Sequence, residues 1–556
     1  MTELLVVIVT GLLVIAGATL VGPRLGIAAP LVLVAIGVAA SFLPVFEAAH
    51  IEPEWILEGV LPPLLYSSAV SMPAMNFRRE FGAISGLSVV LVVSSALVLG
   101  VFFATVVPDL GFAWGVALGA IISPTDAVAT SIIKQTSVSR RVVAMLDGES
   151  LLNDATALVL LRTAIVATAA SFEFWGAVGT FAYSVIVALV VGWLVGRLNL
   201  MIRRRVTDST VNTVISFAVP FAASVPAGLL GGSGLVAAVV AGLVTGIRAP
   251  RDLSAQNRLS DSQNWRTVEL VLEGAVFLTM GLQIKAIVTN VQNDHAGIGS
   301  ALLVSAGALV LTVLVRAGYV APLLAFLSAR ARQRERMQDR LQGMQQRMST
   351  PEGKQETYDE VNLRRRKVSE ADLDRFAVRL TRLVADTEYF LREPLGWREG
   401  TAVVWAGMRG AVTVAAAQTL PEDTPQRSVL VIIAFTVALM SLLVQGGTIG
   451  PLLRRITPRI DQQTLNQQAE TERTNIFSLL RASAESIPEP PPHDGHPTTA
   501  DFEASKTHRL AVLSAQRTAL LDARDNGTFD AEVLAGALAN LDADQIAIEM
   551  RGKLTV

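Results

Sequence analysis

The sequence repeats stretches of about 20 mostly apolar residues, and this pattern restricts the fold more than any other feature. A helix of roughly that length crosses the ~30 Å hydrocarbon layer of a bilayer. Backbone polar groups must be paired inside that layer, which helices achieve within one segment. The sequence therefore predicts an all-α integral membrane protein with thirteen transmembrane helices, near residues 3–21, 27–45, 54–73, 82–107, 112–133, 141–170, 174–199, 209–230, 234–247, 267–288, 298–327, 400–420 and 427–453.

Charge is scarce and unevenly placed along the chain. Only 17% of the 556 residues are charged and 51% are hydrophobic, whereas soluble proteins have about 25% charged residues. Acidic and basic side chains gather in two stretches outside the apolar body. We therefore expect helices 1–11 in residues 1–327, a charged helical cytoplasmic insertion at 328–399, helices 12 and 13 in 400–453, and a cytoplasmic, regulatory C-terminal tail at 454–556.

Composition and missing motifs exclude several classes of protein. The chain has no cysteine, which rules out disulfides, cysteine-ligated metals and a cysteine nucleophile. A net charge of -2 gives no reason to expect nucleic acid as a partner. The N-terminus lacks the basic region of a signal peptide, so we expect its apolar stretch to be retained as the first span. No catalytic triad, phosphate loop or nucleotide motif is present, and we expect neither an enzyme nor a cofactor.

The loops between the spans predict the orientation. Lys and Arg concentrate in cytoplasmic loops of membrane proteins. Here alternate loops carry the basic residues, and the other set is mainly acidic. This alternation predicts an outside N-terminus and a cytoplasmic C-terminus in a multi-pass protein of the plasma (inner) membrane. The basic set includes Arg24, Arg78, Arg79, Lys134, Arg140, Arg141, Arg203, Arg204, Arg205, Arg248, Arg251 and Arg258.

A first polar cluster, SPTDAVAT at 123–130, interrupts the fifth predicted span. Pro124 removes a backbone donor and crowds the preceding turn. A helix broken there exposes carbonyls and half-helix ends that bind ions in secondary transporters. We therefore expect Thr125 and Asp126 at an ion site. The alternative is a proline kink in which Asp126 only caps the restarted helix.

A second polar cluster, DGESLLNDA at 147–155, lies in the sixth span. Ser150 and Asp154 are one turn apart on one helix face, and Glu149 and Asn153 share the adjacent stripe. Ionisable residues at membrane depth indicate function, and Asp154 is the better ion carrier because Ser150 can orient a ligand beside it. The alternative, a solvated helix end, suits Asp147 but not Asp154.

A third cluster, around Arg409 in the twelfth span, has a glycine on either side. An arginine at this depth needs a carboxylate, and Glu149 and Asp126 are the candidates. Arg162 and Arg316 are less informative, because long basic side chains can reach the membrane surface. The interrupted spans, the fifth and the twelfth, are seven apart. Because this offset is odd, the second set of helices enters the membrane with the opposite orientation. We therefore predict an inverted-topology repeat of helices 1–6 on 8–13, in which the two broken helices cross near the midplane.

These clusters resemble motifs of the NhaP/NHE type of monovalent cation/proton antiporters, in the sodium/proton exchanger superfamily. The matching stretches are LPPLLYSSA at 61–69, SPTDAVA at 123–129, DGESLLNDA at 147–155, VLEGAVFLTMGLQI at 271–284 and WAGMRGAV at 405–412, within a resemblance that covers most of 1–453. The resemblance implies a homodimer and a sodium site at Asp154, Ser150 and Thr125, with Asp126 at the unwound helix. It also implies Asn153 paired with the essential aspartate and Glu149 bridged to Arg409.

Two positions depart from the family pattern. Ser67 stands where archaeal relatives carry a glutamate that joins the ion site indirectly. Glu273 stands where relatives often carry Asn, one turn after Glu269. An extra acid there either alters the pH response or lies in a solvated funnel.

A single carboxylate that binds either a proton or a cation is enough for exchange. We expect Asp154 to exchange cytoplasmic Na⁺ or Li⁺ for H⁺ by alternating access, since an empty ionised carboxylate is costly to carry past an apolar barrier. Asn153, where electrogenic relatives have a second aspartate, favours electroneutral 1:1 exchange. A potassium/proton antiporter would share every motif. A channel or non-transporting sensor would lack saturable, proton-coupled flux, and an intramembrane aspartyl protease would need a GxGD motif, which is missing.

The polar segments carry weaker signals. We expect two helical pieces in the insertion, separated at 351–353, with either a regulatory role or lipid contacts through the basic residues 364–367. The tail predicts helices near 461–485, 499–524 and 529–551, with a turn at Asn526 and Gly527. His493 and His496 lie in a Pro-rich linker, where a metal site is disfavoured. The sequence does not identify a regulator that binds the tail.

Overall fold

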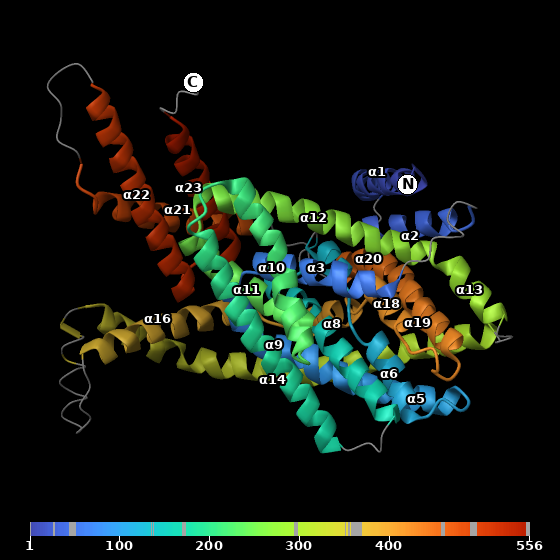
Figure 1. Ribbon diagram of the computed structural model, residues 1–556. Helices are drawn as coiled ribbons and strands as arrows, with labels where there is room; N and C mark the ends of the chain where they lie inside the picture. The colour runs from blue at the N-terminus through green and yellow to red at the C-terminus, as the bar shows by residue number, and fades with distance from the viewer. Residues whose placement is uncertain are drawn as a thin grey trace. The chain divides into compact units, whose positions relative to one another are not determined.

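A computed structural model describes most of the chain, and its described residues contain helices and no strands (Figure 1). Residues 364–367, His493 and His496 lie outside the described part. The described residues are 2–25, 28–43, 52–134, 136, 138–169, 174–293, 298–350, 352–353, 356, 370–456, 462–489 and 498–551.

A helix or an interrupted helix occupies each range predicted to be apolar. Nine described helical segments are long and apolar enough to cross a membrane, and the shorter apolar helices are α2 and α6. The count of thirteen spans stays a prediction. The first part of the chain forms α1 (Thr2–Leu25), α2 (Ala29–Ala40), the π-helix η2 (Trp55–Val60), α3 (Leu61–Ser71), α4 (Ala74–Ser85), the π-helix η3 (Gly86–Leu91), α5 (Val92–Val106), α6 (Phe112–Ile122), α7 (Val128–Ile133) and α8 (Arg140–Ala169).

The rest of the chain continues the helical pattern. Its helices are α9 (Phe174–Arg203), α10 (Ser209–Leu229), α11 (Gly234–Asp252), α12 (Ala255–Leu282), α13 (Ile284–Asn293), α14 (Ile298–Ser349), α16 (Glu370–Arg392), α17 (Trp397–Trp405), α18 (Ala411–Gln418), α19 (Arg427–Ser441), the π-helix η4 (Leu442–Gly446), α20 (Gly447–Ile456), α21 (Gln462–Glu485), α22 (Thr499–Asn526) and α23 (Ala531–Met550).

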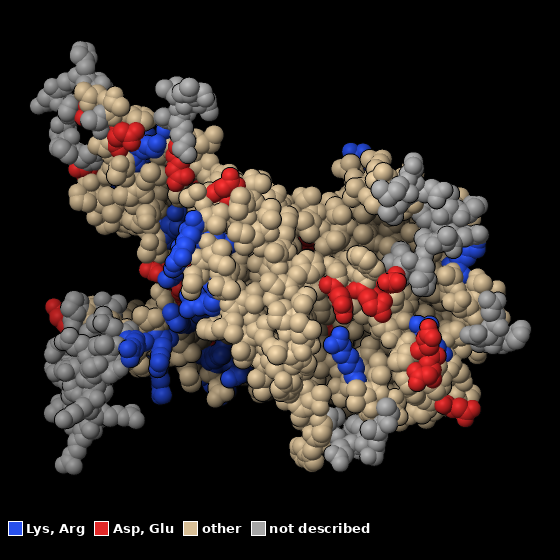
Figure 2. Space-filling model, in the orientation of Figure 1, with Lys and Arg blue, Asp and Glu red and all other residues tan. Residues whose placement is uncertain are grey.

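The chain divides into two compact units. The first comprises Met1–Asp252, Ser260–Leu323 and Trp397–Pro458. On the face shown in Figure 2, much of its surface is uncharged, as expected of helices that contact lipid. Inside this unit, glycines let helices approach closely: a Cβ on Gly100 of α5 or Gly115 of α6 would collide with the facing helix. Small residues at such contacts are typical of membrane helix packing.

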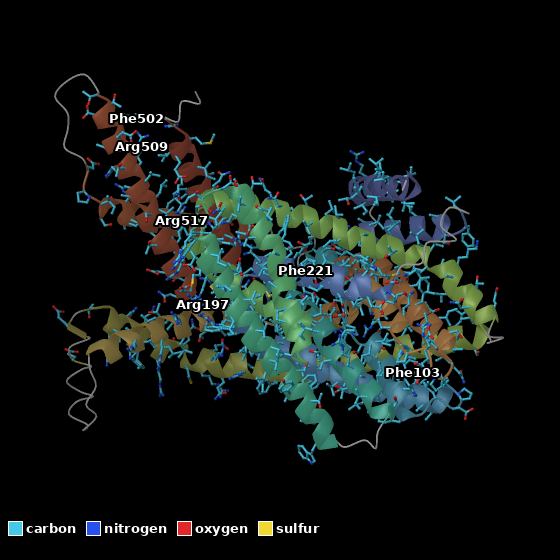
Figure 3. All side chains as sticks on the ribbon, in the orientation of Figure 1. Phe103, Arg197, Phe221, Phe502, Arg509 and Arg517 are labelled. Carbon is cyan, nitrogen blue, oxygen red and sulfur yellow. The ribbon has the colours of Figure 1, made fainter. Side chains whose placement is uncertain are left out.

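The second unit comprises Leu253–Leu259, Leu324–Gly396 and Arg459–Val556. α14 continues without interruption across the expected boundary at 327/328 and ends at Ser349, just before Pro351. The three predicted tail helices are confirmed as α21, α22 and α23, which share an apolar core that includes Ile476, Leu520 and Leu534. Gly527 ends α22 in the left-handed conformation that favours glycine, as the predicted turn requires. Figures 1 and 3 show these helices, with Arg517 labelled on α22.

Candidate functional site

Two helical segments are interrupted, and their interruptions contact each other. α6 ends at Ile122 and α7 begins at Val128, while α17 ends at Trp405 and α18 begins at Ala411. The backbone N–H of Asp126, in the first gap, donates to the carbonyl of Met408, in the second, at 2.7 Å. The predicted breaks are therefore confirmed, and the two gaps are joined through their backbones.

Arg409 donates hydrogen bonds to backbone carbonyls where the two gaps meet. Its Nε donates to the carbonyl of Ile122 at 2.9 Å, and further guanidinium N–H groups donate to the carbonyls of Ser123 and Gly407. Its side chain is 2% exposed. The positive charge therefore lies at the C-terminal end of α6, where the helix dipole is negative. The predicted bridge from Arg409 to Glu149 is wrong, because Arg409 binds carbonyl groups freed by the broken helices.

Glu149 is paired with Arg316 of α14 instead. The guanidinium donates to both carboxylate oxygens, with 2.7 Å between Nη2 and Oε2, and both side chains are 2% exposed. Nε of Arg316 also donates to the carbonyl of Val403 at 2.8 Å. Arg316 is thus buried and paired, and the alternative that its side chain reaches the membrane surface is wrong. The role of Arg316 was not predicted from the sequence, although an arginine within an apolar span was the available signal.

Asn153 and Thr125 connect α8 to the gap after α6. The amide of Asn153 donates to the hydroxyl of Thr125 at 2.7 Å and to its carbonyl at 3.1 Å, and the Thr125 hydroxyl donates to Glu149 Oε1 at 3.1 Å. The prediction that Asn153 pairs with the essential aspartate is therefore wrong. Its Oδ1 is buried and accepts no hydrogen bond within the described structure. A buried oxygen of this kind is commonly satisfied by a water molecule or an ion.

A cavity of about 120 Å³ brings most of the predicted ion ligands together. α8 contributes Ser150 and Asp154, the gap after α6 contributes Thr125 and Asp126, and α12 contributes Glu269 and Glu273. None of the lining residues is Lys, Arg or His. The other lining residues are Leu61, Leu64, Leu65, Ser68, Pro124, Ala127, Leu151, Val276, Phe277, Gly410, Ala411, Val412 and Thr413.

The acids in this wall differ in their partners. Asp126 Oδ1 accepts a hydrogen bond at 3.1 Å from the N–H of Val128, the first residue of α7, and Asp126 also lines the cavity. Glu269 accepts a hydrogen bond from the Ser67 hydroxyl at 3.2 Å. The carboxylates of Asp154 and Glu273 form no hydrogen bond or ion pair with described residues. Four of the predicted site residues do not line the cavity and instead contact residues around it: Ser67, Asn153, Glu149 and Arg409.

The carboxylates do not converge as in a resident metal site. Within the described ranges, no three His, Asp or Glu side chains are close enough together to hold a metal ion. A larger cavity, of about 750 Å³, is lined by η2, α8, α9, α10 and α11 and includes Arg162, Glu54 and Glu58. Its lining includes none of the polar residues of the two gaps. The smaller cavity is therefore the candidate site.

Comparisons with known proteins bear on the family and the fold. Residues 9–352 and 373–455 match the family described as "Sodium/hydrogen exchanger, transmembrane". The chain is 26% identical over 577 aligned positions to an uncharacterised Na⁺/H⁺ exchanger of Mycobacterium bovis, covering 98% of this chain and 96% of the relative. It is 30% identical to a sodium, potassium, lithium and rubidium/H⁺ antiporter of Bacillus subtilis, over 48% of this chain and 41% of the relative.

A solved structure shares the fold. The sodium proton antiporter MjNhaP1 of Methanocaldococcus jannaschii superimposes with a TM-score of 0.55 at 17% sequence identity. The match covers 82% of this chain and 99% of that structure. At this identity the likeness bears on the fold alone.

Proposed function

The chain belongs to the sodium/hydrogen exchanger family as an NhaP/NHE-type monovalent cation/proton antiporter, and from this premise we propose that Asp154 carries both the cation, Na⁺ or Li⁺, and the proton. The observation that carries this proposal is the contrast between two acids of α8. Glu149 is neutralised by Arg316, whereas the Asp154 carboxylate faces the cavity with no basic residue in the wall. The charge of Asp154 is thus left for a transported ion to compensate.

Oxygen atoms around Asp154 supply further ligands for a monovalent cation. Ser150 and Thr125 line the same cavity, and Asn153 and Glu149 hold the Thr125 hydroxyl in place. Asp126 lines the cavity and accepts a hydrogen bond from the backbone N–H of Val128, which holds the gap beside the site. In this mechanism a cation displaces the proton on one side of the membrane, and a proton displaces the cation on the other. Movement of an empty, ionised site past the apolar barrier is disfavoured by its desolvation cost.

We further propose one proton per cation, with the two broken segments at matched positions of an inverted repeat. Asn153, the neighbour of Asp154, adds no second charge. The loop charges support an outside N-terminus and a cytoplasmic C-terminus in the plasma membrane, and family resemblance supports a homodimer in contact with lipid.

The test is exchange in liposomes that contain the purified protein and an internal pH-sensitive dye. Wild type should acidify or alkalinise the lumen when Na⁺ or Li⁺ gradients are imposed. Asp154→Asn should abolish this response, while Asp147→Asn should retain it, because Asp147 is paired with Lys134 at 3.0 Å. Exchange by Asp154→Asn at the wild-type rate would refute the assignment.

Potassium is the alternative cation. The Bacillus subtilis relative is named as an antiporter of sodium, potassium, lithium and rubidium. Competition among Na⁺, Li⁺ and K⁺ in the same liposomes separates the two functions. Saturation with cation concentration separates both from a channel.

A further inference from the structure

α12 presents two acids to the cavity described above. Glu269 and Glu273 are four residues apart, so they lie one turn apart on the same face of the helix. Both line the cavity that contains Asp154. The cation site therefore has acidic side chains from two helices, α8 and α12.

The two acids of α12 have different environments. An oxygen of Glu269 is engaged by the Ser67 hydroxyl. Glu273 has no such donor and no basic partner within the described structure, and the acids Asp126, Asp154 and Glu269 line the same cavity. Its position thus combines a free carboxylate with surroundings of like charge. Such a carboxylate is stabilised by a cation that enters the cavity.

We propose that Glu273 is a second carboxylate ligand of the transported cation, acting together with Asp154. This inference rests on the proposed function of Asp154. Two carboxylates attract a small cation more strongly than one, and the attraction is larger inside a protein than in bulk water. Oxygen ligands of high negative charge also suit hard cations. Glu273 therefore favours Na⁺ and Li⁺ binding, whereas Glu269, held by Ser67, acts less directly.

The test compares Glu273→Gln with Glu269→Gln in the liposome exchange assay. Each variant removes one negative charge from the same face of α12 and keeps the side-chain shape. We expect Glu273→Gln to raise the half-saturating Na⁺ and Li⁺ concentrations about tenfold or more, with a nearly unchanged maximal rate. Glu269→Gln should raise them by less than about threefold, because Glu269 already has a hydrogen-bond partner.

Unchanged half-saturating concentrations in Glu273→Gln would overturn the proposal. An equal change in both variants would also overturn it, because it would indicate that the negative charge of the cavity wall as a whole, and not a ligand at Glu273, attracts the cation. If Glu273→Gln does not fold, judged by size-exclusion elution, Glu273→Asp replaces it. That variant keeps the charge and should stay within about threefold of wild type, while Glu273→Ala should not. Wild type without exchange, or Asp154→Asn with exchange, would instead refute the proposed function.

Discussion

Arg316 donates to both carboxylate oxygens of Glu149, and this ion pair is buried between α14 and α8. The Thr125 hydroxyl, beside the cation cavity, donates to the same carboxylate. The pair therefore connects a long helix to the gap after α6. It fixes the position of one cavity ligand without facing the cavity itself.

Removing one partner of this pair should destabilise the protein. Arg316→Met leaves the Glu149 charge buried and unpaired, which costs about 3–5 kcal/mol. Thermal unfolding of purified protein in detergent should show a lowered midpoint for Arg316→Met. Arg162→Met, which changes an exposed arginine in an apolar segment, is the matched control and should change the midpoint little.

The double variant Glu149→Gln/Arg316→Met should recover part of the loss, since it removes both charges. Equal midpoints for Arg316→Met and Arg162→Met would contradict the structural role of the pair.

Local sequence features predicted much of the site. Pro124 located the first broken segment, and the spacing of Ser150 and Asp154 predicted that both side chains share one face, which the cavity confirms. Each of these inferences depends on residues close together in the chain. Helical geometry converts such spacing directly into position.

Partners distant in the sequence could not be predicted in the same way. Glu149 pairs with Arg316, 167 positions away, and not with Arg409. Both arginines occur in apolar segments, and the choice between them depends on how α14 and α17 pack. Arg409 also has acceptors that composition does not reveal, since the carbonyls of Ile122, Ser123 and Gly407 become available only where helices are interrupted.

Gly410 should tolerate no side chain. A Cβ at this position would overlap the carboxylate of Asp126. Asp126 lies in the gap after α6, and its backbone N–H donates to Met408 in the gap that contains Gly410. Gly410→Ala must therefore move one of the two gaps, and we expect exchange to fall at least about tenfold because small displacements in a site are costly. Gly447→Ala is the control, since a Cβ there meets nothing within 4 Å. Wild-type exchange by Gly410→Ala would show that this close contact is dispensable.

Exchange should not respond to a membrane potential. With Asp154 as the one carrier, each cation replaces one proton and no net charge moves. Rates measured at imposed potentials of either sign should agree, and a potential-sensitive dye should record no change during exchange. A potential created by transport would instead require a second proton for each cation. Two carboxylates of the cavity, those of Asp154 and Glu273, have no hydrogen-bond or ion-pair partner in the described structure. Glu273 would therefore be the first candidate to carry the second proton.

Asp542 should stabilise the helices of the second unit. Its carboxylate accepts hydrogen bonds from Arg258, at the start of α12, and from Arg517 of α22 at 2.7 Å. These three side chains are 14–16% exposed, so Asp542→Asn leaves two largely buried arginines without their shared acid. We expect a loss of about 1–3 kcal/mol, measured as faster tryptic cleavage within residues 499–551. Glu485→Gln is the control. It removes the partner of the exposed Arg481, and trypsin should cleave this variant at the wild-type rate. Equal cleavage of both variants would show that Asp542 does not hold these helices together.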